Sequence, residues 1–234
     1  YVNTGAYSGH DWFYETAKWM AGKVSVPVAI HLDHGDSFER CMEMLKLGFT
    51  SIMFDGSALP VEENAAATEA VARVCRSFGV PLEAEIGELC RLDDRGNKIG
   101  ASNIADPDVV RQYLKLCHPD SLAIGIGNAH GFYNGPVDIR VEVLEECRKF
   151  TDIPFVLHGC TGMDEELVKR SIDSGVAKIN FGTQVRCQYV NYLKEGLAEG
   201  KDQGHAWKLS QYAELRLRED IKDIIRLAGS KEKA

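Results

Sequence analysis

Three of the seven histidines occupy equivalent places in the sequence, each near the end of a short apolar run and directly before a glycine. They are His34, His130 and His158. A catalytic zinc ion takes three protein ligands, commonly imidazoles, and keeps a fourth position open. The three residues therefore predict a metal site, if the fold brings them together. The alternative is that each imidazole makes ordinary hydrogen bonds inside a packed site.

The other histidines do not share this pattern. His10, His118 and His205 stand in helical or loop contexts, and we expect them to be surface or packing residues. His31 lies inside an expected strand, and we expect it to be a hydrogen-bonded core histidine.

Two glycine-containing loops have the composition of a phosphate site. Glycine N–H groups, a threonine hydroxyl and a helix N-terminus together attract an anion. Turn glycines with capping threonines are the alternative. The expected phosphate-binding residues in the loops 158–162 and 180–183 are Gly159, Cys160, Thr161, Asn180, Phe181, Gly182 and Thr183.

The elements that must position these residues alternate along the chain. Short apolar runs predict strands at 26–32, 51–54, 82–86, 122–126, 155–157 and 177–179. Amphipathic runs predict helices at 37–47, 62–78, 107–116, 139–150 and 164–174. This alternation is typical of a parallel sheet with helical crossovers. Because no glycine fingerprint follows the first strand, we predict an α/β fold of the (β/α)8 TIM-barrel type.

Barrel enzymes carry their catalytic groups at the carboxyl ends of the strands, which is where all three histidines fall. Only six strands are expected, and residues 183–228 are taken up by C-terminal helices. We therefore expect a single domain over 1–234 that lacks its N-terminal strand or strands, which would precede Tyr1. The tail 230–234 is expected to fray.

Composition narrows the function classes. The 234 residues include 27 Lys and Arg against 35 Asp and Glu, a net charge of −8, which disfavours nucleic acid or an anionic membrane as partner. No apolar run reaches the roughly 18 residues of a membrane-spanning helix. The seven cysteines form no C-x-x-C motif, and we expect a reduced, cytoplasmic protein.

Six segments, in this order and spacing, resemble class II aldolases of the fructose-bisphosphate and tagatose-bisphosphate family. They read VPVAIHLDHG, SIMFDGSALPVEEN, LEAEIGEL, GIGNAHGFY, IPFVLHGCTG and AKINFGT. The resemblance runs from residue 1 to 183, and more loosely to 230. It implies a zinc-dependent barrel enzyme that cleaves a ketose bisphosphate into dihydroxyacetone phosphate and an aldehyde.

The resemblance also assigns residues. It implies that His34, His130 and His158 bind the zinc, and that Asp33 is the catalytic acid/base at the hydroxyl of the cleaved bond. A second divalent metal at Asp55 and Glu85, and Na+ or K+, occur in some members. The matching substrate and phosphate contacts are Gly131, Gly159, Thr161, Asn180 and Thr183. Members are dimers or tetramers, so we expect a homo-oligomer.

Asp33 and His34 are neighbours, and neighbouring residues of a regular strand face opposite ways. Both can serve one site only where the pleating stops, so we expect them at a strand end.

Two departures from the family pattern leave alternatives open. In the loop 88–97, Cys90 and Arg91 stand where the family has a Gly-Gly pair, although Asp93 and Asp94 could supply a carboxylate. Gly182 stands where many fructose-specific members place an aspartate. Tagatose bisphosphate or an inositol-catabolic phosphoketose therefore remains open as substrate. A non-catalytic relative that binds zinc and a sugar phosphate, and a zinc hydrolase on the same barrel, are the competing readings.

Overall fold

A curved parallel sheet is the centre of the fold in the computed structural model, which describes residues 9–87, 90–92, 98–99, 104–131 and 138–233. Its six strands follow the order β1-β2-β3-β6-β8-β9. They are β1 (His31–Gly35), β2 (Ser51–Phe54), β3 (Leu82–Ile86), β6 (Ser121–Ile124), β8 (Phe155–Leu157) and β9 (Val176–Ile179).

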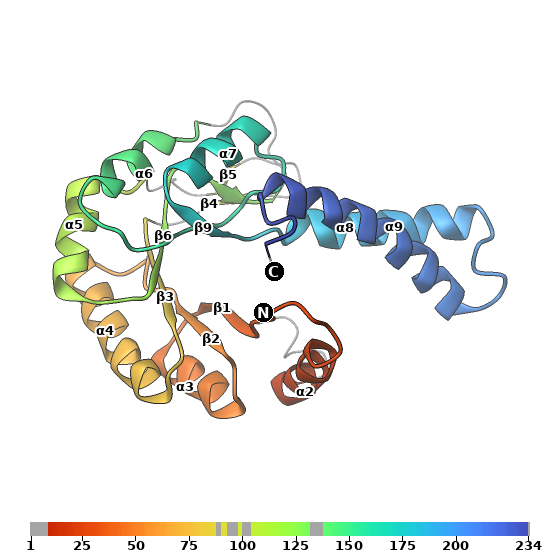
Figure 1. The fold of residues 1–234 in the computed structure, drawn as a ribbon, viewed down its shortest axis with the longest axis horizontal. Helices are drawn as coiled ribbons and strands as arrows, with labels where there is room; N and C mark the ends of the chain where they lie inside the picture. Colours follow the sequence, from red (N-terminus) through yellow and green to blue (C-terminus); the bar gives the residue numbers. More distant parts are fainter. Residues whose placement is uncertain (1–8, 88–89, 93–97, 100–103, 132–137, 234) are drawn as a thin grey trace.

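A helix connects each strand of this sheet to the next, and these helices lie along the outside of the arc of strands (Figure 1). Gly48 and Gly79 end two of the helices in the left-handed conformation, and Asp106 caps a third, which starts with Pro107. The helices are α3 (Phe38–Leu47), α4 (Val61–Phe78), α5 (Pro107–Leu116), α6 (Val141–Arg148) and α7 (Glu165–Asp173).

The two faces of the sheet differ in polarity because side chains alternate along each strand. On β3, Leu82, Ala84 and Ile86 face the helices and belong to the two main hydrophobic clusters. Glu83 and Glu85 face the other way, and both are buried. Register pairs these carboxylates with Met53, Ser121 and Ala123 on the neighbouring strands, and a small cluster of Met53, Ala123 and Val156 lies on this inner face.

Contacts across the inner face show how strongly the sheet curves. Lys178 on β9 lies 2.9 Å from Glu83 on β3, although two strands separate β9 from β3 in the sheet. Asn180, just after β9, donates to Asp33 on β1, so the two outermost strands approach each other. The sheet is therefore the wall of a (β/α) barrel, which confirms the predicted fold class.

The predicted strands 51–54, 82–86 and 155–157 coincide with β2, β3 and β8, and the strands predicted at 122–126 and 177–179 shift by one or two residues. The strand predicted at 26–32 overlaps β1 only at His31 and Leu32, so its bounds are wrong. β1 pairs with β2 only from His31, and it continues to Gly35. Val26 and Val28 are each 48% exposed and precede β1, so these apolar residues do not belong to a buried strand.

Helix α2 (His10–Ala21) and a second sheet were not predicted from the sequence. The second sheet has the order β5-β4-β7, with β4 (Cys90–Leu92), β5 (Lys98–Ile99) and β7 (Ala129–His130). Strands of two or three residues carry too little alternation to be recognised. β4 runs parallel to β7 and pairs Arg91 with His130, so this described part of the atypical 88–97 loop lies beside a predicted metal ligand. Asp93 and Asp94 lie outside the described residues.

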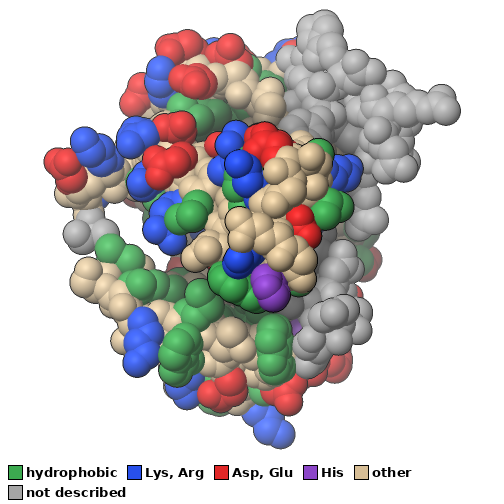
Figure 2. Space-filling model, turned by 90° about the vertical axis from the view of Figure 1, so that its right-hand side faces the viewer, with side chains coloured by type: hydrophobic (Ala, Val, Ile, Leu, Met, Phe, Trp, Pro, Cys, Tyr) green, Lys and Arg blue, Asp and Glu red, His purple; other side chains and the backbone are tan. Residues whose placement is uncertain are grey.

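Two long helices, α8 (Thr183–Ala198) and α9 (Ala206–Leu227), form a hairpin that projects from the barrel wall (Figure 1). They pack closely at Gly196, where an added Cβ would lie 2.7 Å from Tyr212. Viewed from the side of the hairpin, hydrophobic side chains gather below it, towards the part of the molecule that holds α2 (Figure 2). Within the described residues, no helix combines the length and apolar character needed to cross a membrane.

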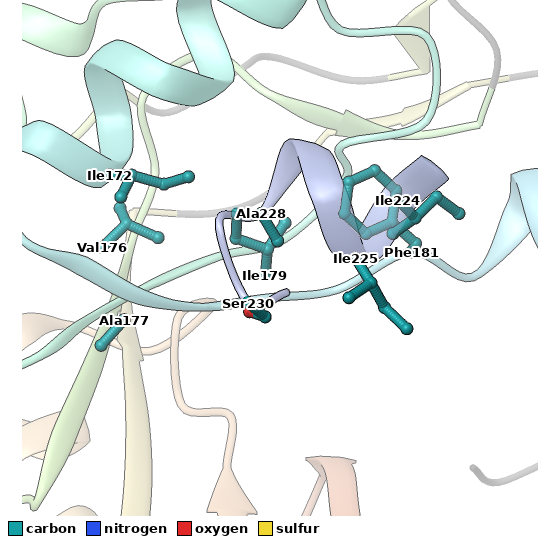
Figure 3. A pocket seen from close by; sticks show the side chains of 9 residues that line it. All are labelled: Ile172, Val176, Ala177, Ile179, Phe181, Ile224, Ile225, Ala228 and Ser230. Atoms are coloured by element: carbon teal, nitrogen blue, oxygen red, sulfur yellow. The ribbon is translucent and has the colours of Figure 1, made fainter. Parts of the chain in front are cut away.

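The C-terminal end of α9 returns to the barrel wall beside β9. Ile224 of α9 and Ala228, just after this helix, line an apolar cavity of about 240 Å³ together with Val176 and Ile179 of β9 (Figure 3). Phe181, one of the predicted phosphate-loop residues, also lines this cavity.

Candidate metal and substrate site

The three histidines predicted from the sequence lie together at the carboxyl ends of β1, β7 and β8. The ring centroid of His34 is 5.1 Å from that of His130 and 4.7 Å from that of His158, and the last two are 6.2 Å apart. One nitrogen from each ring lies within 4.8 Å of the others. Three imidazoles in this arrangement form a donor set of the kind that zinc takes.

An irregular backbone at the end of β1 allows Asp33 and His34 to serve the same site. His34 has a φ of +54°, in the left-handed region, and the register with β2 shifts between Leu32 and Gly35. Such an irregularity redirects side chains. As a result, Asp33 Oδ1 lies 4.0 Å from His34 Nε2 and 3.8 Å from His158 Nδ1. The regular pleating is thus interrupted at the last residues of β1, close to the strand end where we expected it.

Asp55 orients the ring of His34. His34 Nδ1 is 2.7 Å from Asp55 Oδ2, while Asp55 Oδ1 accepts hydrogen bonds from the backbone and hydroxyl of Ser57. A carboxylate on the far nitrogen is the usual way in which a metal-binding histidine is oriented. Within the described residues, His34 Nε2 is buried and has no hydrogen-bond partner. A buried nitrogen of this kind fits a metal ligand.

The charges around His34 reinforce this arrangement. Burial tends to raise the pKa of Asp55, but its hydrogen bonds with His34 and Ser57 outweigh burial and hold the pKa at about 2. Burial tends to lower the pKa of His34, whereas the Asp55 hydrogen bond and the Asp33 charge raise it above the usual value. The carboxylates of Asp33 and Asp55 thus favour a positive charge at His34, as suits a bound cation.

Glu83 orients His158 in the same way, and the sequence analysis assigned it no role. His158 Nε2 lies 2.8 Å from Glu83 Oε1, and Lys178 Nζ lies 2.9 Å from Glu83 Oε2. Burial tends to raise the pKa of Glu83, but the His158 hydrogen bond and the Lys178 charge lower it to about 2. The strict alternation of LEAEI was the available signal, because it places Glu83 and Glu85 on the same face.

Asn128 is a second residue without an assigned role in the sequence analysis. Its amide nitrogen donates to the carbonyl oxygen of His158 at 2.7 Å, and its oxygen accepts from the backbone of Ile126 at 3.0 Å. Asn128 therefore holds the loop after β6 against the end of β8. The Asn128 side chain is only 2% exposed, so both hydrogen bonds form away from solvent.

The two residues predicted to hold a second metal lie beside the Nδ1 atom of His34. Asp55 and Glu85 form, with His34, a second group whose possible ligand atoms lie within 4.8 Å of one another. Glu85 Oε2 is 3.5 Å from His34 Nδ1. Since His34 belongs to both groups, it links the predicted zinc site with the predicted second site.

Asn180 and the glycine-containing loops border the histidine cluster. Asn180 Nδ2 lies 3.1 Å from both Asp33 Oδ1 and His158 Nδ1. Gly159, with a φ of +64°, passes so close to β7 that an added Cβ would lie 2.4 Å from the carbonyl oxygen of Ala129. Gly131 directly follows His130 at the end of β7.

The N-terminus of α8 lies beside both loops. Thr161 is buried, and its hydroxyl accepts a hydrogen bond from the backbone of Gln184 in the first turn of that helix. Thr183 is the first residue of α8, and an added Cβ at Gly182 would meet open space.

Cys160 and Phe181, from the same loops, have their side chains elsewhere. The thiol of Cys160 packs in the main hydrophobic cluster, where burial raises its pKa, and Phe181 lines the cavity beside β9. In any phosphate site, these two residues would take part through their backbones.

The remaining histidines lie outside the cluster. His31 bonds Ser51 through Nδ1 at 2.8 Å, and burial and Lys178 lower its pKa to about 4, against the opposing charge of Glu83. Its Nδ1 is hydrogen-bonded as predicted, but the residue is only partly buried, and its Nε2, 3.7 Å from Glu83 Oε2, makes no hydrogen bond with the described residues. His118 is exposed and bonds Glu69, while His205 precedes α9.

Comparison with known proteins decides the family. The family model described as fructose-bisphosphate aldolase class-II matches residues 2–233. The chain belongs to this family. Class II aldolases are lyases and are generally metal-dependent, and the histidine cluster offers a group of side chains that could hold a metal ion.

Individual class II aldolases support the assignment. The fructose-bisphosphate aldolase of Staphylococcus epidermidis is 34% identical, over 100% of this chain and 83% of that protein. The 6-phospho-5-dehydro-2-deoxy-D-gluconate aldolase of Bacillus velezensis is 40% identical over 69% of this chain, which spans only 55% of that relative. The crystal structure of the YdjI aldolase from Escherichia coli K12 superposes with a TM-score of 0.83 at 28% identity, over 99% of this chain and 80% of that one.

Proposed function

We propose that the protein is a zinc-dependent aldolase that cleaves a ketose 1,6-bisphosphate, fructose or tagatose, to dihydroxyacetone phosphate and glyceraldehyde 3-phosphate. The observation that carries the proposal is that His34, His130 and His158 lie together, with the carboxylate of Asp33 beside them. The Nε2 atom of His34 is buried there and makes no hydrogen bond with the described residues. Membership of the class II aldolase family supports the reaction type.

The donor set favours zinc among the divalent metals, since three neutral imidazoles suit zinc better than magnesium or calcium, which prefer oxygen ligands. When bound, the metal supplies Lewis acidity for the negative charge that develops next to the carbonyl as the carbon–carbon bond breaks. The oxygen-rich group of Asp55 and Glu85 is the proposed position of a second divalent metal. Na+ or K+ is a further proposed cofactor.

Asp33 is the proposed acid/base. Cleavage requires removal of a proton from the hydroxyl at the bond that breaks, and return of the proton in the reverse reaction. The Asp33 carboxylate lies within 4.0 Å of a His34 nitrogen and accepts a hydrogen bond from Asn180, so its position is fixed at the edge of the cluster.

The proposed substrate contacts surround the same point. Backbone N–H groups of Gly131 and Gly159, and the N-terminus of α8 beside Thr161 and Thr183, suit a phosphate group. Asn180 would contact the sugar from the side of β9. The full proposed set adds Cys160, Phe181 and Gly182, which complete the two loops.

A related aldolase with another substrate is the second candidate. Two observations favour it: a relative named 6-phospho-5-dehydro-2-deoxy-D-gluconate aldolase is 40% identical, and Gly182 leaves open space where an aspartate would reach a substrate. The atypical segment that begins at β4 lies beside His130 and keeps a non-catalytic, zinc-binding relative as the remaining alternative.

The amphipathic helix α9 supports a homo-oligomer, a dimer or tetramer. Its side chains Trp207, Leu215, Ile221 and Ile225 are each more than a third exposed, which suits a subunit contact. Free thiols at the described cysteines support the cytoplasm as the proposed location.

The test is aldol cleavage with zinc added, and again after chelation. The substrates are fructose 1,6-bisphosphate, tagatose 1,6-bisphosphate and 6-phospho-5-dehydro-2-deoxy-D-gluconate. We expect cleavage of one of the first two, abolished by the chelator and restored by zinc. Preference for the third substrate would establish the second candidate. Zinc binding without any cleavage would identify the non-catalytic relative.

A further inference from the structure

An ion pair between the buried Glu83 and the half-buried Lys178 lies beside His158, on the inner face of the sheet. One oxygen of Glu83 is 2.8 Å from His158 Nε2, and the other is 2.9 Å from Lys178 Nζ. The Glu83 and His158 side chains are 2% and 1% exposed. A carboxylate at such depth is stable only if it has a countercharge and hydrogen-bond donors, and Lys178 and His158 supply them.

The contacts of Glu83 determine which nitrogen of His158 is available to a metal. An ionised carboxylate can only accept hydrogen bonds, so His158 must donate from Nε2. The lone pair of the neutral ring is then on Nδ1. This nitrogen faces the cluster, 3.8 Å from Asp33 Oδ1.

The contacts of Lys178 lead independently to the same arrangement. A lysine can only donate, so the atom of Asn180 that lies 2.8 Å from Lys178 Nζ is the carbonyl oxygen of its amide. The NH2 group of Asn180 must therefore face Asp33 Oδ1 and His158 Nδ1, each at 3.1 Å. Because this NH2 group donates to His158 Nδ1, that nitrogen must carry the lone pair of the ring. The contact between His158 Nε2 and Glu83 requires the same tautomer.

We propose that Glu83 and Lys178 are positioning residues of the metal site. Glu83 fixes the orientation and tautomer of His158, and Lys178 supplies the countercharge for Glu83 and fixes the amide of Asn180. Neither residue touches the reacting atoms. This inference rests on the proposed function, because it takes His158 as a metal ligand.

The experiment measures zinc affinity by competition with a chromophoric chelator, together with the visible spectrum of the Co²⁺-substituted protein. The variants are Glu83→Leu, Lys178→Met, the double variant with both changes, and Glu83→Gln. We expect Glu83→Leu and Lys178→Met each to lower zinc affinity by about 10- to 100-fold and to alter the cobalt spectrum. Glu83→Gln, which keeps an acceptor for His158, should retain more affinity than Glu83→Leu.

The double variant separates positioning from mere stability. It replaces an ion pair whose carboxylate is buried by two apolar side chains, an exchange that often preserves folding. Because Lys178 acts largely through Glu83, we expect the double variant to lose no more zinc affinity than Glu83→Leu alone. Losses that multiply would overturn the proposal, and zinc affinity equal to wild type in the double variant would overturn it even if both single variants failed to fold.

A surface ion pair of the same types is the matched control. On α7, Lys169 Nζ lies 2.7 Å from Glu166, with side chains 51% and 81% exposed. Glu166→Leu and Lys169→Met should leave zinc affinity and the cobalt spectrum unchanged. A wild-type protein that binds no zinc would defeat the proposed function itself, whereas a zinc-binding wild type matched by Glu83→Leu would defeat only the positioning role.

Discussion

Along β3, successive residues belong to two different parts of the molecule. Leu82, Ala84 and Ile86 point outwards and pack with the helices in the hydrophobic clusters, whereas Glu83 and Glu85 point inwards to the histidines. Both sets are buried, so burial alone does not distinguish them. Apolar contacts on the outer face stabilise the fold, whereas the charges buried on the inner face, which the proposed chemistry needs, reduce its stability.

The neighbouring strands repeat this division. On β8, Phe155 and Leu157 belong to the outer core, while His158 at the end of the strand faces the cluster. The comparison implies that substitutions on the outer face change stability and leave metal binding intact, whereas substitutions on the inner face weaken metal binding.

The largest effect is expected for His130→Ala on the inner side. Removing one of three imidazoles should abolish zinc retention through gel filtration, because two ligands hold the ion too weakly. Metal content measured by atomic absorption checks this. His118→Ala, at a side chain that is 73% exposed, is the control and should retain the metal. Full zinc content in the His130 variant would remove that residue from the site.

Asp33→Ala should keep the zinc and lower the rate of aldol cleavage by about 10²- to 10⁴-fold, the usual contribution of a general acid or base. The steady-state rate with saturating zinc is the measurement. Asp108→Ala, at a side chain 89% exposed on α5, provides the comparison. Turnover that persists in the Asp33 variant would show that another group carries the proton.

Phe155→Ala tests the outer face. The side chain is fully buried, and its removal should cost about 3–5 kcal/mol of unfolding free energy through lost contacts and a cavity. Urea denaturation of the zinc-free protein would measure this loss separately from metal binding. Phe78→Ala, where the ring is 63% exposed, should change stability by less than about 0.5 kcal/mol. A Phe155 variant that folds but cannot bind zinc would contradict the prediction that outer-face substitutions leave metal binding intact.

The smallest effect is expected for Tyr113→Phe. The buried hydroxyl lies 2.7 Å from Thr68, which also bonds Asn64, within the helical layer. Its removal leaves this network short of one partner and should cost about 1–2 kcal/mol. Zinc affinity should stay the same. A marked loss of affinity would mean that this network, which continues from Asn64 to the backbone of Glu85, supports the site from behind the sheet.

Sequence alone was sufficient for several parts of this protein. The apolar runs located β2, β3 and β8, and the position of His34, His130 and His158 near strand ends selected the residues that meet in the structure. Both signals are local. Alternation follows from the geometry of a strand, and in a parallel sheet all carboxyl ends lie at one edge.

Other features depend on the assembled sheet. The residues at 26–32 are apolar enough for a strand, but β1 exists only where β2 offers hydrogen-bond partners. The left-handed backbone at His34 lies where the register between β1 and β2 shifts, and this conformation is uncommon for a residue other than glycine.

The pairing of Glu83 with Lys178 was beyond any local pattern, because 95 positions separate them (178 − 83) and only the curvature of the sheet brings their side chains to 2.9 Å. The contact of Asn180 with Asp33 joins residues 147 positions apart for the same reason. Sequence determined which side chains face inwards, because side-chain direction is set by the strand itself. The tertiary structure decided which of them meet, because distances across a barrel depend on the twist and curvature that all its strands share.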